Sequence, residues 1–271
     1  MTSLQNYPDT LFSHKRRRLL GLTGTGMLGL FAPQFVHAQA WRQLDAARNS
    51  VGNAAVLENG LRLTLPLVAE DGSSVPLTIS SEVSEGPRIK RLEVFAPANP
   101  TPEVAVFEFG PEIEKVNLAT RIRLSESQTV VAIAHTDDGR AIVAEREVRV
   151  TTSGCIAPAQ SDPSNEMQAR VRVPKRWRTG ASAEVLTMIS HPMITGLAQD
   201  TNGDTPPTRI INQFEATLDG RPLLSAKYYR SLAANPYLKF DIAPTQEGDL
   251  QFQWIEDTGR TVRHTERVSL A

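Results

Sequence analysis

Apolar and polar residues alternate along most of the chain. Leu61, Leu63, Leu65 and Leu67 are each separated by one residue, a spacing that indicates a strand buried on one face. The same alternation recurs at residues 75–79, 116–124, 131–133, 185–189, 214–218, 238–242 and 250–254. Turn sequences at Asp137–Arg140 and Asp257–Arg260 follow two of these runs, and no long amphipathic helix is indicated. The pattern predicts an all-β fold of antiparallel β-sandwiches.

A stretch without this alternation separates two sets of expected strands. Residues 151–165 are small and polar, include Pro158 and Pro163, and carry too little apolar surface to fold alone. We therefore expect two β-sandwich domains, residues 41–152 and 169–271, joined by a flexible linker at residues 153–168. The two sets of strands differ in sequence and do not form an internal repeat.

The N-terminal 40 residues have the features of an export signal. Lys15–Arg18 precede paired leucines and an apolar run at residues 21–31, and small residues follow at Ala38 and Ala40. This order is typical of a secretory signal peptide, and the paired arginines indicate the twin-arginine type. We expect cleavage after Ala38 or Ala40, export to a periplasm, and no membrane span in the mature protein.

Composition excludes several classes of function. The chain has 29 Lys+Arg against 30 Asp+Glu, so a nucleic-acid partner is not expected. Its single cysteine rules out an internal disulfide and a cysteine-based zinc site. No phosphate-binding loop, dinucleotide fingerprint or Gly-x-Ser-x-Gly motif occurs, and no cofactor is expected.

The single cysteine, Cys155, lies in the expected linker. It is either an incidental thiol or an accessible nucleophile that carries a covalent cargo. Five residues separate it from Val150, where the preceding strand is expected to end, so the thiol would extend at most about 16–18 Å from that strand. No Lys, Arg or His lies within residues 151–160, which suits a carrier better than a thiol-dependent enzyme with its own base.

Short motifs in both halves resemble one known family. The first half has Val94–Ala96 followed by Asn99–Pro100, with further motifs at residues 104–107, 119–124 and 127–132. The second half has Ile189–Met193, Thr195–Gly196, Ile210–Asn212, Phe214–Ala216 and Ala233–Leu238. On these motifs the chain resembles the sulfur carriers SoxY and SoxZ, fused into one chain.

The resemblance implies a fold and a function. In that family two immunoglobulin-like sandwiches pair with each other. A cysteine in a glycine-rich arm of SoxY holds thiosulfate-derived sulfur while periplasmic Sox-type enzymes process it. The resemblance therefore implies that Cys155 is the covalent attachment residue, that Gly154 gives the arm its flexibility, and that the protein is a non-catalytic carrier.

The arm also departs from the family pattern. Glycines flank the family's cysteine and the chain ends there, whereas Ile156, Ala157 and Pro158 follow Cys155 and the chain continues. Fused carriers of this kind resemble a subgroup associated with quinoprotein (PQQ) dehydrogenases. The alternative function is therefore an accessory or interaction protein of such a dehydrogenase, in which Cys155 carries no sulfur.

Histidines and one basic segment are the remaining candidates. His191 precedes Pro192 at the expected end of a strand, where it either contacts the arm or a partner or caps a turn. His135 and His264 could converge with it, but no short metal-ligand spacing occurs, so no metal site is expected. Lys175–Arg178 is either a docking patch or a solvated loop.

Overall fold

The computed structural model describes residues 39–82, 86–154, 166–199 and 203–271. All of them belong to one compact unit, Ala38–Ala271. Almost all of the expected leader, and Cys155 itself, lie outside the described residues. Within the part of the chain described, no helix is both long and apolar enough to cross a membrane.

The described residues fold mainly into strands, with two short helices at the N-terminal end. The helical elements are the 3₁₀ helix η1 (Ala40–Gln43) and α1 (Asp45–Val51). The strands are β1 (Val56–Leu57), β2 (Leu61–Thr64), β3 (Val68–Asp71), β4 (Val75–Ser81), β5 (Ile89–Phe95), β6 (Glu103–Phe109), β7 (Asn117–Ile122), β8 (Gln128–Thr136), β9 (Ala141–Thr152), β10 (Ala169–Arg172), β11 (Ala183–Ile189), β12 (Ile211–Leu218), β13 (Arg221–Tyr228), β14 (Tyr237–Ile242), β15 (Gly248–Glu256) and β16 (Thr261–Val268). The all-β prediction is confirmed.

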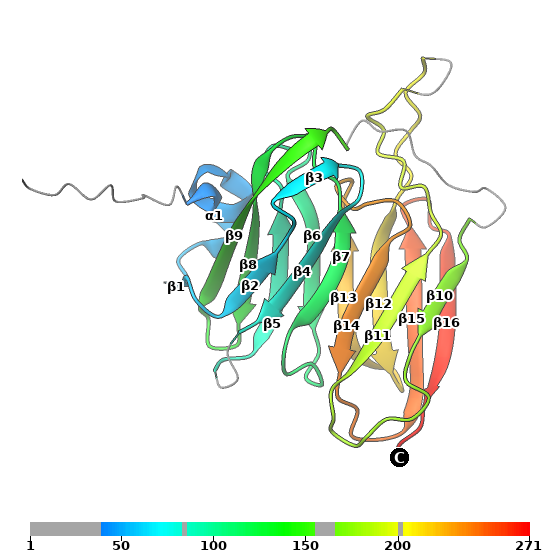
Figure 1. Cartoon of the computed structure of the whole chain (residues 1–271). Coiled ribbons are helices and arrows are strands. Elements are labelled where there is room, and N and C mark those ends of the chain that lie inside the picture. The colour runs from blue at the N-terminus through cyan, green and yellow to red at the C-terminus, as the bar shows by residue number, and fades with distance from the viewer. Residues whose placement is uncertain (1–38, 83–85, 155–165, 200–202) are drawn as a thin grey trace, which may run out of the picture. The chain divides into compact units, whose positions relative to one another are not determined.

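The strands form two layers, each shared by both halves of the chain. One sheet has ten strands, in the order β1-β9-β8-β5-β6-β13-β12-β15-β16 with β3 also on β9; the other has six, in the order β10-β11-β14-β7-β4-β2. The halves join edge to edge in both sheets, through antiparallel pairing of β6 with β13 and of β7 with β14. Figure 1 shows β7 and β14 side by side at this junction. The two antiparallel sandwiches therefore share continuous sheets, and the edge strands at the junction are paired.

Alternating burial along the strands builds the core. β15 alternates between buried and more exposed residues along its length, as period-two strands with one covered face do. In the second half, Phe214, Phe240, Phe252 and Trp254 are buried, with ring centroids 5.4–6.4 Å apart. Burying each such side chain contributes about 1.5–3 kcal/mol to folding.

One predicted strand is shorter than its sequence pattern. The alternation continues to Leu67, but β2 ends at Thr64 and the Leu67 side chain is exposed. Pro66 has no N–H to donate to a sheet ladder, so strand pairing stops before it. The prediction that Leu67 is buried is therefore wrong.

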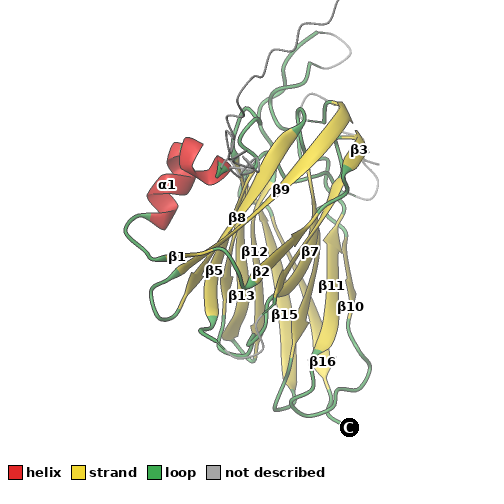
Figure 2. Cartoon of the chain, turned by 60° about the vertical axis from the view of Figure 1, so that its left-hand side comes forward, coloured by secondary structure: helices red, strands yellow, loops and turns green. Residues whose placement is uncertain are grey.

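The N-terminal helices cover part of the large sheet from outside, as Figure 2 shows for α1 beside β8. Trp41, Ala47 and Val51 are buried against Phe95 of β5 and Ile133 of β8, in a second, smaller core. The sequence did not indicate α1, because a helix of seven residues is too short to give a clear period of 3.6.

A polar cluster fastens α1 to the sheet. The Ser50 hydroxyl on α1 donates to Glu93 Oε1 at 2.9 Å, and His135 Nε2 lies 2.9 Å from the same hydroxyl. Arg91 Nε donates to Glu93 Oε1 at 2.9 Å. Burial disfavours the charged carboxylate, but the hydrogen bonds from His135, Arg91 and Ser50 outweigh it and lower the pKa of Glu93 to about 2.

Replacing Glu93 with glutamine should flatten the acid side of the stability profile. The unfolded carboxyl binds a proton near pH 4.5 and the folded one only near 2. The stability that ionised Glu93 contributes is therefore fully present above pH 4.5 and is lost as the pH falls toward 2. At pH 7 we expect Glu93→Gln to lose about 1–2 kcal/mol, measured by urea unfolding across the pH range.

Glu108→Gln is the matched control. Glu108 also pairs with Arg91, but its side chain is 61% exposed, so the loss should be at most about 0.5 kcal/mol. Equal pH profiles for wild type and Glu93→Gln would contradict the stabilising role of the Glu93 carboxylate.

Candidate functional site

The backbone immediately before Cys155 is fixed where three segments of the first half meet. The Gly154 N–H donates to the Leu124 carbonyl at 2.9 Å, and the Leu124 N–H donates to the Gly72 carbonyl at 2.8 Å. The Gly72 N–H donates to the carbonyl of Thr152, the last residue of β9, at 2.8 Å. We call this meeting point of Gly72, Leu124 and Thr152–Gly154 the arm root. It lies beyond the end of β3, which pairs with β9 in parallel (Figure 1).

Two glycines make this close approach sterically allowed. A Cβ on Gly154 would lie 1.9 Å from the Gly72 carbonyl oxygen, and a Cβ on Gly72 would lie 2.3 Å from the Leu124 oxygen. Both obstructing atoms belong to the backbone and cannot rotate away. The structure thus gives Gly154, which is buried, a role in packing that the sequence did not indicate.

The arm root changes the length of free chain before the thiol. The sequence places the end of the strand near Val150, five residues from Cys155. In the structure β9 runs to Thr152 and Gly154 is hydrogen-bonded, so Cys155 follows directly after an anchored residue. The upstream reach of about 16–18 Å from Val150 is therefore an overestimate.

Arg123 lies beneath the arm root, with its side chain inside the protein. The residue is 2% exposed. Its guanidinium donates through Nη2 to the carbonyls of Met193 at 3.1 Å and Pro192 at 3.3 Å, and through Nε to that of Leu232 at 3.3 Å. Nη1 lies 3.5 Å from the carbonyl oxygen of Gly154. One arginine of the first half therefore contacts both the arm root and two loops of the second half.

A buried amide continues this connection between the halves. Asn99 Nδ2 donates to the Arg123 carbonyl at 2.8 Å and lies 2.9 Å from the Ser231 hydroxyl of the second half. Asn99 Oδ1 accepts from the Ser125 N–H and from Gln128 Nε2. Since each of these polar groups has a partner, the network adds specificity to the junction without an unpaired polar atom among them.

His191 is fully buried and has partners on both ring nitrogens. Nδ1 accepts from the Met193 N–H at 3.0 Å, so the proton is on Nε2, which donates to Glu256 Oε1 at 2.9 Å. Burial lowers the pKa of His191 and outweighs the attraction of Glu256, so the imidazole is neutral. The residue next to it, Pro192, contacts Arg123, so His191 supports the loop on which the arm root rests.

Glu166, His191 and Glu256 have ligand atoms within 4.8 Å of one another, a spacing that could hold a metal ion. Their electrostatics favour an ion-pair network instead. Arg209 pairs with Glu166, Arg260 donates to Glu166 at 3.2 Å, and both arginines lie 3.8 Å from Glu256 Oε1. The two guanidinium groups already neutralise the negative charge that these carboxylates would offer to a metal cation. Both nitrogens of the histidine are also occupied by hydrogen bonds.

The same ion-pair network also anchors the chain downstream of Cys155, through Glu166. Glu166 is the first described residue there, and the next N–H, that of Met167, donates to the Ser190 carbonyl at 2.7 Å. Upstream, Gly154 is linked through Arg123 to Pro192 and Met193. Both ends of the segment that carries Cys155 are thus anchored to the chain around His191.

The other sequence candidates lie away from this point. His135 belongs to the α1 cluster, and His264 on β16 pairs with Glu266 at 2.8 Å, so the three histidines do not converge. In the basic segment, Trp177 is buried and its backbone N–H donates to the Ser269 carbonyl, while Lys175, Arg176 and Arg178 are solvated.

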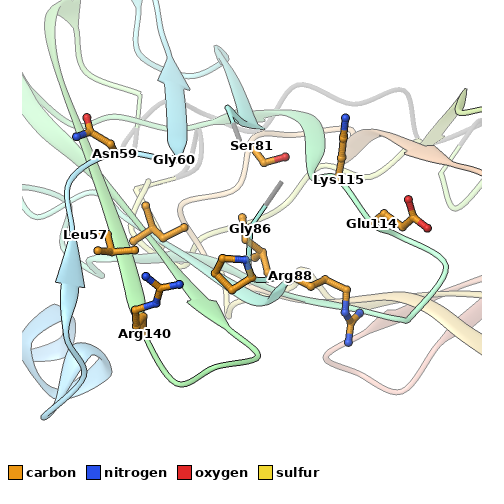
Figure 3. A pocket seen from close by; sticks show the side chains of 12 residues that line it. Leu57, Asn59, Gly60, Ser81, Gly86, Arg88, Glu114, Lys115 and Arg140 are labelled. Atoms are coloured by element: carbon orange, nitrogen blue, oxygen red, sulfur yellow. The ribbon is translucent and has the colours of Figure 1, made fainter. Parts of the chain in front are cut away.

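A cavity of about 580 Å³ lies at the opposite end of β4 from the arm root. Figure 3 shows its lining, in which Leu57 lies on the left and Gly86 near the centre, and the charged groups of Arg88, Lys115 and Glu114 point in different directions. Since these charges do not converge on one point, the cavity offers no defined site for an ionic ligand.

Sequence reasoning missed Gly72 and Arg123. Arg123 belongs to the family motif at residues 119–124, but only the fold brings its side chain to Gly154, which is 31 residues away along the chain. Burial of an arginine is rare unless its donors are satisfied, and the strand alternation at residues 116–124 would place Arg123 on the exposed face with Arg121, so the local sequence contained no signal for its burial.

Comparison with known proteins agrees with the two halves of the fold. The family Sulfur oxidation protein SoxY matches residues 47–155, and Sulphur oxidation protein SoxZ matches residues 171–267. Among curated proteins, none matches the chain.

Two solved structures illustrate the matches to parts of the chain. The sulfur carrier protein SoxY from Chlorobium limicola f thiosulfatophilum is 29% identical, covering 40% of this chain and 94% of its own, with a TM-score of 0.35. A superoxide reductase (neelaredoxin) from Ignicoccus hospitalis is 15% identical, covering 34% of this chain and 80% of its own, with a TM-score of 0.29. The two family matches span most of the chain one after the other, so the protein is a fusion of a SoxY domain with a SoxZ domain and belongs to the SoxYZ family of sulfur-oxidation carriers.

Proposed function

We propose that this protein holds a thiosulfate-derived sulfur intermediate covalently on Cys155 and presents it to partner enzymes in the periplasm. The observation that carries the proposal is the extent of the SoxY match, which ends at Cys155, the only cysteine of the chain. The arm root supports it, because it anchors the base of the segment that carries Cys155 to a rigid body.

The attachment chemistry requires an oxidant. A sulfur–sulfur bond forms between Cys155 and the outer sulfur of thiosulfate, giving a cysteine S-thiosulfonate. The thiol proton passes to solvent, and two electrons pass to an electron-accepting partner enzyme. The carrier itself supplies only the thiolate, which is consistent with a non-catalytic role.

The proposal includes a division of the chain. Residues 1–40 would be a twin-arginine signal peptide, residues 41–152 the SoxY-like sandwich, residues 153–168 the segment bearing Cys155, and residues 169–271 the SoxZ-like sandwich. The family matches at residues 47–155 and 171–267 support the last three parts, and the order of charged, apolar and small residues supports the first.

Mass spectrometry of the intact protein tests the function. After incubation with thiosulfate and periplasmic extract of the native host, we expect the wild type to gain the mass of one S₂O₃ group. Cys155→Ser should gain nothing. Ser153→Ala, a change two residues upstream, should behave as the wild type.

The alternative role as an accessory of a quinoprotein dehydrogenase predicts a different result. The arm's departure from the family at Ile156, Ala157 and Pro158 is the observation that favours it. If no adduct forms, and if dehydrogenase-dependent growth requires the protein but not the thiol of Cys155, the accessory role replaces the carrier.

A further inference from the structure

One end of the six-stranded sheet has a row of cationic and apolar side chains on its outer face. The row crosses five neighbouring strands, with Pro76 on β4, Arg121 on β7, Tyr237 on β14, Met188 on β11 and Arg170 on β10. The proline and both arginines are exposed, and the tyrosine and methionine are partly exposed. Figure 1 shows these strands side by side. We call these five residues the basic row.

The two arginines of the basic row have no carboxylate partner. Among the described residues, neither of them takes part in an ion pair, and Arg121 lies over the Tyr237 ring, 5.4 Å from its centroid. The next outward-facing row carries Lys239 and Arg172, but both pair there with Glu184, at 3.0 and 3.6 Å. Since the whole chain has 29 Lys+Arg against 30 Asp+Glu, the positive charge belongs to this row and not to the protein as a whole.

The residue types of the basic row are those of protein interfaces. Its centre is Tyr237 and Met188, and an arginine lies on each side of them. Arginine, tyrosine and methionine are enriched at protein–protein interfaces. Arginine and tyrosine are also enriched among the residues that contribute most of the binding energy. The row therefore combines an apolar centre with two cationic ends.

The basic row lies at the end of the sheet next to both anchored ends of the segment that carries Cys155. Leu124 of the arm root follows Arg121 by three residues, and the hydrogen-bonded Met167 precedes Arg170 by three. Three residues span at most about 10–11 Å. A protein seated on the row would therefore contact the body beside the places where this segment leaves and rejoins it.

We propose that the basic row is the docking surface for a partner enzyme whose own surface has an acidic rim around an apolar centre. The inference rests on the proposed function, in which enzymes must reach the cargo, and it names the surface that they bind. Charge complementarity of this kind speeds association and fixes the orientation of the partner more than it tightens the complex.

Charge reversal in the full chain tests the role of the row. Arg121→Glu combined with Arg170→Glu reverses both cations, and loading from thiosulfate and periplasmic extract is followed by intact mass. Lys227→Glu combined with Arg263→Glu is the matched control. These two exposed cations lie on the outer face of the ten-stranded sheet, where Lys227 lies over the Tyr229 ring, 5.1 Å from its centroid.

The two double variants should differ in loading rate. At low salt we expect the row variant to load about tenfold more slowly than the wild type, and the control to stay within about twofold of it. The difference should shrink at high salt, because salt screens exposed charges. Equal rates in the row variant and the control would overturn the inference. If the double variant does not fold, Arg170→Glu alone is compared with Arg263→Glu in the same way.

Photo-crosslinking identifies what binds to the row. In separate proteins, p-benzoylphenylalanine replaces Met188 in the row or Gln253 on the outer face of the ten-stranded sheet, and each is irradiated in the extract. We expect crosslinking from position 188 to a protein segment rich in Asp and Glu, with a yield about fivefold lower in the charge-reversed row. A crosslinked segment without an acidic surplus would overturn the inference. So would crosslinking to a second copy of this chain, or to added phosphatidylglycerol vesicles in place of a protein.

Failure of this inference can be told apart from failure of the proposed function. Loading at the wild-type rate in the row variant, with no more crosslinking at position 188 than at position 253, would reject only the docking surface. Crosslinking at position 188 to an acidic segment, together with no loading of the wild type, would reject only the sulfur cargo.

Discussion

Replacing Gly154 with alanine is expected to lower the free energy of unfolding by about 2–4 kcal/mol. The new Cβ would lie 1.9 Å from the Gly72 carbonyl oxygen and 2.3 Å from the Ser73 nitrogen. Both atoms belong to backbone that is fixed by the hydrogen bonds of the arm root, so relief requires those bonds to break. Urea unfolding followed by tryptophan fluorescence measures the loss.

Two other glycines serve as controls. Gly180 has a positive φ of 67°, and a Cβ added to it would meet nothing within 4 Å, so Gly180→Ala should cost only about 1 kcal/mol, from backbone strain. A Cβ on Gly110 would lie 2.0 Å from the Pro222 oxygen, so Gly110→Ala should lose as much stability as Gly154→Ala, but away from the arm root.

Hydrogen exchange then shows which part of the structure each substitution destabilises. The N–H groups of Gly72, Leu124 and Gly154 should exchange faster in Gly154→Ala and at the wild-type rate in Gly110→Ala. If Gly154→Ala is no less stable than Gly180→Ala, the two glycines of the arm root do not pack as described.

The fold could be predicted from sequence because period-two alternation is a local property. Burial of alternate residues in β12, β14 and β15 follows the apolar positions at 214–218, 238–242 and 250–254. The turns at Asp137–Arg140 and Asp257–Arg260 also connect strands as expected, β8 to β9 and β15 to β16. Each of these features depends on residues within one strand or turn.

The arrangement of the candidate site could not be predicted in the same way. Pairing of β6 with β13 and of β7 with β14 joins residues more than 100 positions apart, and no local pattern encodes it. The contact of Arg123 with Pro192 and Met193 depends on that pairing. Gly154 illustrates the same limit of local reasoning, because its close partner, Gly72, lies on a segment 82 residues earlier.

The sequence left two interpretations of His191 open: it contacts the arm or a partner, or it caps a turn. Its burial in the structure determines which variant tests its role. The residue is 0% exposed, and it supports Met193, whose carbonyl accepts from Arg123. A contact between the imidazole and a partner would require the surrounding chain to open. Removing the imidazole instead tests the support beneath the arm root.

His191→Ala is expected to destabilise the protein by about 3–4 kcal/mol. The change leaves a cavity, removes a hydrogen bond to the buried Glu256 carboxylate, and leaves the Met193 N–H without its acceptor. Thr258, Arg209 and Arg260 still face Glu256, which keeps the loss below that of a fully unpaired buried charge. His264→Ala is the control: that side chain is 32% exposed and pairs with Glu266, so its loss should stay below about 1 kcal/mol.

The pH dependence of the same variant identifies the charge state of His191. Burial lowers the pKa of folded His191 below 6.5, so the unfolded chain binds a proton that the folded chain resists. The stability that depends on the neutral imidazole is therefore present above pH 6.5 and falls as the pH decreases below it. As the pH falls below 6.5, the wild type should lose stability more steeply than His191→Ala. Parallel profiles in urea unfolding would instead mean that folding does not lower the pKa of His191, and a wild type that gains stability relative to His191→Ala as the pH falls would mean that His191 is paired as a cation with ionised Glu256.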